Sequence, residues 1–254
     1  MRRKGGLEVI LKAENLTKAF GGLLAVNDVS LEVEEKELSS IIGTNGAGKT
    51  TLFNLLTGDL QCDSGKVIFD GEDITNLPPY QICRRGIARS FQVTNIFPRL
   101  STFENIQVAV LSAQRKSSRL FSPSAGMARK ETNEILESIG LSDQKEMLGS
   151  LLSHGDRRRL DIGIALASHP RLLLLDEPTA GMSPKESVEI TELIQKLAKE
   201  RHLSILFIEH DMSIVFDISE KIRVMHQGRI FFEGTPEEVK ANDRVQEIYL
   251  GEES

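Results

Sequence analysis

The segment GTNGAGKTT, from Gly43 to Thr51, lies between a short apolar run that begins at Leu38 and a helical pattern from Lys49 to Thr57. It matches the pattern G-x-x-x-x-G-K-[ST] at every fixed position. Glycines let the backbone curve closely around a phosphate chain and turn several amide groups toward it. The amino terminus of the following helix adds its positive dipole end. The segment therefore predicts a strand, a phosphate-binding loop and a helix, which form the centre of a P-loop α/β fold.

The polar side chains of this loop predict a nucleotide and a metal ion as ligands. Lys49 can reach the β- and γ-phosphates, and the Thr50 hydroxyl can ligate Mg²⁺. The loop residues predicted to bind the nucleotide are Asn45, Gly46, Gly48, Lys49, Thr50 and Thr51.

A second acidic site is predicted at the end of the apolar run RLLLLDEP, Arg171–Pro178. Such a run is typical of a strand that is buried on both faces of a parallel sheet. Asp176, at the tip of the strand, can hold the hydration shell of Mg²⁺, and Glu177 can face an attacking water. The alternative interpretation is a pair of surface acids, which the phosphate loop makes less favoured.

Hydrophobic patterns divide the chain into an α/β core and a helical insertion. Alternation in NDVSLEVE, residues 27–34, predicts a half-buried antiparallel strand. We expect a single domain, 1–254. Its mostly parallel core and antiparallel β arm comprise residues 1–97 and 168–254, and a helical lobe is inserted at 98–167. Within the lobe, the polar and Ser-rich residues 112–126 predict an exposed connection.

The segment LSHGDRRRLDIG, Leu152–Gly163, predicts the start of a helix in this lobe. Ser153 followed by Asp156 fits a helix cap, in which the serine hydroxyl accepts a hydrogen bond from an otherwise unpaired amide. An open helix amino terminus is also an anion site. Spacing alone favours the cap.

Composition limits the class of protein. The 254 residues are 40% hydrophobic and carry a formal net charge of -6, which does not favour nucleic acid as the main partner. Cys62 and Cys83 have no metal-binding spacing, and we expect free thiols in a reducing compartment. The amino-terminal residues do not form a signal peptide, and no segment has the roughly 18 apolar residues that span a bilayer. We therefore expect a soluble, cytoplasmic protein.

Further short segments resemble the ATP-binding subunits of ABC transporters. Besides the phosphate loop and LLLLDEP, these are KAFGG (Lys18–Gly22), SFQ (Ser90–Gln92), LSHGD (Leu152–Asp156), AGMS (Ala180–Ser183) and IEHD (Ile208–Asp211). They occur in the order typical of the family, and the resemblance covers about Leu11 to Gly251. The stretches around SFQ and at the carboxyl terminus resemble the large ATPase subunit of branched-chain, or hydrophobic, amino acid importers.

The resemblance implies a role for individual residues. It implies ATP and Mg²⁺ as cofactors, with Glu177, His210 and Lys49 as catalytic residues. Thr50, Gln92 and Asp176 would ligate the metal. Phe20 would stack on the adenine, and Val26 and Gln92 are counted with the nucleotide-binding residues.

The resemblance also implies a head-to-tail dimer with a second, identical or similar, ATPase subunit. The signature motif of one subunit, with Ser153 and the Gly155 amide, would bind the γ-phosphate of ATP held by the other. Here His154 replaces the usual glycine and Asp156 the usual glutamine. A carboxylate there should repel phosphate unless it faces away or pairs with one of the arginines at 157–159.

The expected partners include membrane proteins. The resemblance implies two integral membrane permease subunits, with Ile96, Phe97 and Leu100 as apolar contacts, and an extracytoplasmic solute-binding protein that acts indirectly. The chain would then lie peripherally at the cytoplasmic face of the inner membrane, and no nucleic acid is expected.

Three alternatives remain open at this point. One is the ATPase of a lipid or lipopolysaccharide exporter, which the insertion at 112–126 disfavours. Another is a soluble ABC ATPase that acts on ribosomes or DNA. Such proteins usually have tandem ATPase units or a long coiled coil, and neither is present. A catalytically inactive partner is disfavoured by the presence of Lys49, Asp176, Glu177 and His210.

Overall fold

The computed structural model describes residues 8–90, 96–114 and 124–250. The strands are β1 (Val9–Phe20), β2 (Leu23–Glu34), β3 (Leu38–Ile42), β4 (Ser64–Phe69), β5 (Glu72–Asp73), β6 (Ile87–Ser90), β7 (Leu172–Asp176), β8 (Ser204–Ile208), β9 (Lys221–His226) and β10 (Arg229–Gly234). The helices are α1 (Lys49–Leu56), α2 (Pro79–Arg85), α3 (Thr102–Ala113), α4 (Ser124–Ser138), α5 (His154–Leu166), α6 (Pro184–Arg201), α7 (Met212–Ile218), α8 (Pro236–Lys240) and α9 (Asp243–Leu250). Two 3₁₀ turns lie at Ser142–Gln144 and Gly149–Leu151.

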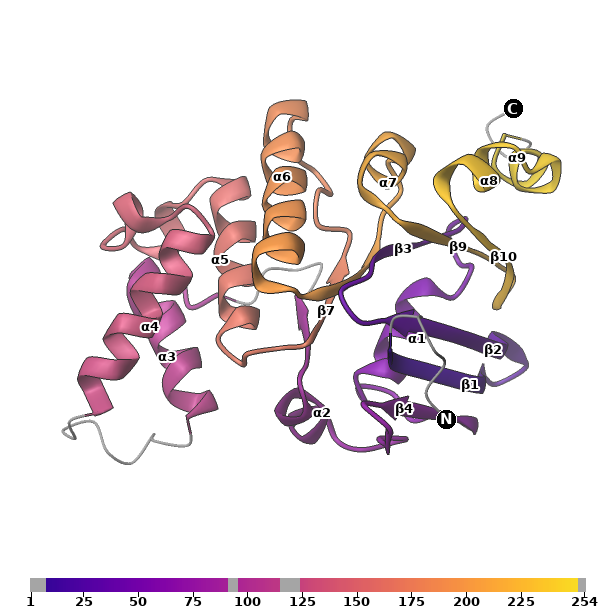
Figure 1. Ribbon diagram of the computed structural model, residues 1–254, viewed down its shortest axis with the longest axis horizontal. Coiled ribbons are helices and arrows are strands. Elements are labelled where there is room, and N and C mark those ends of the chain that lie inside the picture. The colour runs from indigo at the N-terminus through magenta and orange to yellow at the C-terminus, as the bar shows by residue number, and fades with distance from the viewer. Residues whose placement is uncertain (1–7, 91–95, 115–123, 251–254) are drawn as a thin grey trace.

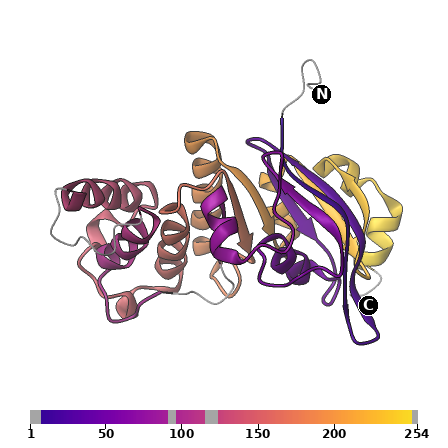
Figure 2. The ribbon, with the colours of Figure 1, turned by 90° about the horizontal axis from the view of Figure 1, so that it is seen from below.

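Two sheets form the core. The larger has the order β10-β9-β3-β8-β7-β6, in which β9, β3, β8, β7 and β6 are parallel and β10 is an antiparallel edge. The smaller is antiparallel and has the order β2-β1-β4-β5. Helices α3, α4 and α5 gather at the end of the molecule opposite the antiparallel sheet (Figures 1 and 2). The predicted fold class is confirmed.

The leucine run in β7 is buried on both faces of the larger sheet. Leu173 and Leu175 pack into the hydrophobic cluster that also contains helices α5, α6 and α7, whereas Leu172 and Leu174 pack toward α1 and the antiparallel sheet. A strand in this position needs apolar residues at every position, because neither face meets water. This burial places the two acids that follow, Asp176 and Glu177, at the carboxyl edge of the sheet.

Local sequence signals set several helix starts. Ser183 and Glu186 form a capping box at the start of α6, with Pro184 as the first helical residue. Thr235 and Glu238 do the same for α8. Each box satisfies two otherwise unpaired amides, so these boundaries agree with the sequence pattern.

The predicted division into a core and a lobe at 98–167 stays a prediction, although the elements from α3 to α5 are all helical or 3₁₀. The predicted exposed connection at 112–126 falls largely on residues 115–123, which lie outside the described residues. Within the described residues, no helix is both long enough and apolar enough to span a membrane.

Candidate functional site

The phosphate loop joins β3 to α1 and presents an uncapped helix amino terminus. Gly46 and Gly48 have φ values of 79° and 101°, in the region that glycine adopts without strain. A Cβ on Gly48 would lie 2.1 Å from the carbonyl oxygen of Ala25, so a larger residue would collide with backbone. Within the described part of the chain, no side chain caps α1. The amides of its first turn are therefore available to an anion.

Lys49 is buried beneath this loop. Its Nζ donates hydrogen bonds to the carbonyl oxygens of Gly43, at 2.6 Å, and Thr44, at 3.1 Å. Burial lowers the pKa of Lys49, and the negative charges of Glu177 and Asp176 oppose that shift. The phosphate loop thus holds the Lys49 ammonium group next to the place where the loop would bind a phosphate chain.

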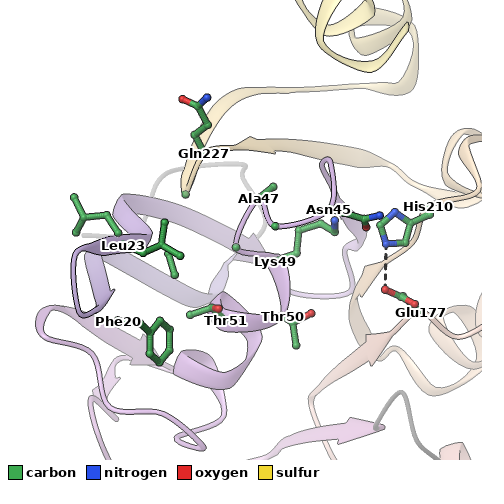
Figure 3. A pocket seen from close by; sticks show the side chains of 15 residues that line it. Phe20, Leu23, Asn45, Ala47, Lys49, Thr50, Thr51, Glu177, His210 and Gln227 are labelled. Atoms are coloured by element: carbon green, nitrogen blue, oxygen red, sulfur yellow. Dashed lines mark hydrogen bonds and ion pairs between the residues drawn. The ribbon is translucent and has the colours of Figure 1, made fainter. Parts of the chain in front are cut away.

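A pocket of about 620 Å³ surrounds the loop. Figure 3 shows that Phe20 lies at one end of it, while Glu177 and His210 face each other at the other end beyond Lys49. Its lining residues are Phe20, Leu23, Leu24, Ala25, Asn45, Gly46, Ala47, Gly48, Lys49, Thr50, Thr51, Glu177, His210, Gln227 and Gly228. The pocket therefore brings most of the predicted nucleotide-binding residues together with all three predicted catalytic residues.

Val26 does not line this pocket. Its side chain is completely buried in the core under the antiparallel sheet, and Ala25 lines the pocket in its place. The sequence-based expectation for Val26 is therefore corrected: the side chain contributes to packing and not to the nucleotide surface.

The end of β7 carries a carboxylate that suits a metal ion. Asp176 is 2% exposed, and its Oδ2 accepts a hydrogen bond from Nη2 of Arg89 at 2.7 Å. Its Oδ1 is buried and has no hydrogen-bond partner among the residues that the structure describes. A carboxylate oxygen left unpaired, with the Thr50 hydroxyl on the pocket wall, is a donor set of the kind that Mg²⁺ prefers. The third predicted ligand, Gln92, lies outside the described residues.

Glu177 and His210 are in direct contact. Nε2 of His210 donates to Oε1 of Glu177 across 3.1 Å, as the dashed line in Figure 3 marks. The backbone of Glu177 has a φ of 47°, a strained value for a residue with a side chain. This turn directs the carboxylate toward the pocket. A base next to an imidazole, at the phosphate end of a nucleotide pocket, can activate a water.

The signature motif forms the predicted cap. The hydroxyl of Ser153 accepts a hydrogen bond from the Asp156 amide at 3.1 Å and donates to Asp156 Oδ2 at 2.9 Å. Neither Ser153 nor Gly155 lines the pocket described above. Hydrogen bonds from Ser183 hold the pKa of Glu186 below its ordinary value, and the Gly155 amide adds to this effect. In the single chain, a carboxylate of α6 thus lies against the amino terminus of α5.

The three arginines after the signature motif have separate partners. Arg159 lies 4.0 Å from Asp156 and 2.7 Å from Glu189. Arg157 donates to the carbonyl oxygen of Ser150. Arg158 is buried against the end of β7. Of the three arginines expected to offset the negative charge of Asp156, only Arg159 lies within ion-pair distance of it, at the long distance of 4.0 Å.

Sequence reasoning missed three charged groups around the acidic end of β7, namely Arg89, Arg158 and Glu209. Each is buried, with an exposed fraction of 6% or less for its side chain or residue. A signal for Arg89 and Glu209 existed, because each is a charged residue inside or directly after an apolar strand. Charged residues are rarely buried there without a partner.

Comparisons with known proteins agree with this geometry. The family model described as "ABC transporter" matches residues 26–180, and the model "Branched-chain amino acid ATP-binding cassette transporter" matches residues 229–254. The chain belongs to the ABC transporter family. It is an ABC transporter ATPase with the family's α/β fold and nucleotide pocket.

Named relatives of this ABC ATPase cover almost its whole length. It is 42% identical over 250 residues to the high-affinity branched-chain amino acid transport ATP-binding protein BraF of Pseudomonas aeruginosa, which covers 96% of this chain and 98% of BraF. It is 42% identical over 252 residues to LivG of Escherichia coli, again with 96% and 98% covered. The lipopolysaccharide export system ATP-binding protein LptB of Escherichia coli is 36% identical over 248 residues, with the same coverage.

Solved structures of ABC cassettes have the same fold. The ADP conformation of MJ1267 is 31% identical, covers 96% of this ABC ATPase and 99% of its own chain, and has a TM-score of 0.83. A dimeric post-hydrolysis structure of MJ0796 bound to ADP and phosphate is 27% identical, covers 89% and 99%, and has a TM-score of 0.76. ABC cassettes thus bind nucleotide and dimerise.

Proposed function

We propose that this ABC ATPase is the motor subunit of an importer for branched-chain or other hydrophobic amino acids. The assignment of the transported solute rests on the similarity to BraF and LivG. The match of residues 229–254 to the branched-chain transporter model supports it. The chain would act at the cytoplasmic face of the inner membrane with two permease subunits. It would receive its solute, indirectly, from an extracytoplasmic binding protein.

The pocket supports a division of labour along the ATP molecule. Phe20 would stack on the adenine, and the amides of Gly46 and Gly48 with the Lys49 ammonium would hold the phosphates. Thr50 and Asp176 would hold Mg²⁺, with Gln92 as a further ligand. The ion would supply positive charge to the β- and γ-phosphate oxygens.

The end of β7 supports the catalytic step. Glu177 would accept a proton from the attacking water, and His210, which already contacts Glu177, would keep the water and the γ-phosphate in line. Because Ser153 and Gly155 lie outside this pocket, they would act on ATP held by a second subunit. In that dimer the phosphate would replace Glu186 at the amino terminus of α5.

Transport in a reconstituted system tests the proposal. The chain would be placed in proteoliposomes with its permeases and a binding protein, and ATP-driven uptake of radiolabelled leucine would be measured. Uptake that requires ATP and is lost with Glu177→Gln is the expected result. Absence of leucine uptake, with release of lipopolysaccharide to an acceptor instead, would identify the export function of the LptB type.

Phe20 gives a prediction about nucleotide choice. Its ring is 48% exposed and offers a stacking surface without base-specific hydrogen bonds. Phe20→Ala should weaken the binding of ATP and GTP alike by about 1 kcal/mol, the low end for base stacking, because the ring is half open to water. Calorimetric titration of both nucleotides checks this, with the exposed Tyr80→Ala as control. A loss for ATP alone would contradict simple stacking.

An exposed apolar surface next to the helical lobe supports the permease partner. Phe97 is 52% exposed. Backbone hydrogen bonds join residues 98–102, which follow it, to residues 147–150. Met147, Leu148 and Leu151, in or next to this second segment, also have exposed side chains. Water-exposed apolar groups clustered in this way are typical of a binding surface. We propose that these side chains contact the permease.

Phe97→Ser should reduce permease-stimulated ATP hydrolysis severalfold and leave the activity of the free subunit unchanged. The reason is that Phe97 does not line the nucleotide pocket and would lose only its contact with the permease. Phosphate release with and without the permeases measures both activities. Tyr80→Ser, at another exposed aromatic residue, serves as the control. Normal stimulation of the Phe97 variant would place the contact elsewhere.

A further inference from the structure

Arg158 reaches from the signature helix α5 to the backbone that carries the catalytic glutamate. Its residue is 4% exposed. Nε donates to the carbonyl oxygen of Pro178 at 3.0 Å, and Nη2 donates to that of Asp176 at 2.9 Å and also to that of Glu177. One guanidinium group therefore binds three consecutive carbonyl oxygens, and the middle one belongs to Glu177.

The turn that Arg158 binds has a strained backbone at Glu177. Glu177 adopts its φ of 47° directly after the last residue of β7. Such a conformation is strained for a residue with a side chain, and it persists where surrounding contacts determine it. The Glu177 amide donates to the carbonyl oxygen of Ile208 at 2.9 Å, which fixes one side of the turn. On the carbonyl side, the Ala180 amide donates to the Glu177 carbonyl oxygen at 3.2 Å, and Arg158 adds its hydrogen bonds to the carbonyl oxygens of Asp176, Glu177 and Pro178.

A buried carboxylate holds the residue that follows the turn. Glu209 accepts hydrogen bonds from the amide and hydroxyl of Thr179, at 2.9 and 2.5 Å, and from the amide of His210 at 3.0 Å. Asp161, one turn along α5, lies 3.9 Å from Arg158. Burial lowers the pKa of Arg158, and the negative charges of Asp161 and Glu209 oppose that shift. The buried cation is thus balanced by acids on both sides.

We propose that Arg158 is a positioning residue for ATP hydrolysis, through which the signature helix holds Glu177 toward the nucleotide of its own subunit. The proposal rests on the proposed function. The reason is that two sites lie close together on α5. Ser153, at its amino terminus, would meet the ATP of the partner subunit, and Arg158 lies little more than one helical turn further along. The helix that senses one ATP therefore sets the base that acts on the other.

A plain packing role for Arg158 makes a different prediction from a positioning role. Removal of packing should lower thermal stability and disturb the signature helix, so ATP-driven dimerisation should weaken as well. Removal of positioning should lower the hydrolysis rate and leave ATP binding and dimerisation unchanged. The split between these measurements separates the two roles.

The test is Arg158→Lys, with Arg157→Lys as the matched control on the same helix. Lysine keeps the charge toward Asp161 and Glu209, but its single ammonium group cannot replace a planar guanidinium fork on three carbonyl oxygens. We expect kcat for ATP to fall about tenfold, as is common when the partners of a reacting group are removed. The Kd of the free subunit for ATP should stay the same, as should dimerisation in the Glu177→Gln background. Arg157→Lys should match the unchanged chain in all three measurements.

Each outcome decides the proposal. Unchanged kcat in Arg158→Lys overturns it, and so does a joint loss of kcat, dimerisation and melting temperature, which would show packing alone. If Arg158→Lys does not fold, Asp161→Asn removes the acid beside Arg158 and keeps the guanidinium. A lower kcat at unchanged Kd supports the proposal there, and an unchanged kcat overturns it. Failure of the unsubstituted chain to hydrolyse ATP would instead refute the proposed function.

Discussion

Glu177→Gln should lower steady-state ATP hydrolysis by about 10²–10⁴-fold, because the loss of a general base typically has that effect. The amide is nearly the same size as the carboxylate, so the turn held by Arg158 and the contact with His210 can persist. Binding of ATP should be preserved, since the phosphates are held by the loop and Lys49. The variant should therefore accumulate as a dimer with ATP trapped between its subunits.

Phosphate release, ATP binding and sedimentation measure these three consequences in one preparation. Glu192→Gln, at an exposed position of α6, makes the same chemical change away from the pocket and should behave like the unsubstituted chain. Hydrolysis at a near-normal rate in Glu177→Gln would remove Glu177 from the role of general base.

Lys49→Met should weaken ATP binding by about 3 kcal/mol, or about 100-fold in Kd, the upper value for a hydrogen bond to a charged group. The methionine side chain fills similar apolar space but cannot donate to the β- and γ-phosphates. The free chain should stay folded, because Lys49 is a buried cation whose pKa burial already lowers. Removal of its charge also removes an unfavourable desolvation.

Titration of a fluorescent ATP analogue gives the Kd, and thermal melting without nucleotide gives the stability. Lys185→Met, at a side chain that is 88% exposed on α6, controls for the loss of one positive charge. An ATP affinity equal to that of the control, at normal stability, would show that the loop amides alone hold the phosphates.

Much of this fold could be predicted because its determinants are local. The glycines, lysine and threonine of the phosphate loop act through backbone geometry and a helix terminus that neighbouring residues create. The leucine run in β7 reports burial on both faces. Ser153 and Ser183 each indicate the start of a helix, because each can accept a hydrogen bond from the amide three residues further on. The family resemblance then added roles for Phe20, Glu177 and His210, and the pocket brings these residues together with Lys49.

The sequence by itself determined the order of strands and helices, the phosphate loop and the position of the two acids, because each depends on residues close together in the chain. Only the tertiary structure decided that Arg158 holds the turn of Glu177 from 19 residues away, and that Arg89 pairs with Asp176 from 87 residues away. The tertiary structure also decided on which face of the antiparallel sheet the Val26 side chain lies. The alternation of Val29, Leu31 and Val33 would place Val26 on the opposite face, but between the pairs Leu16–Val29 and Lys18–Val26 one residue of β1 opposes two of β2. The extra residue reverses the alternation, so Val26 turns into the core and Ala25 toward the nucleotide pocket.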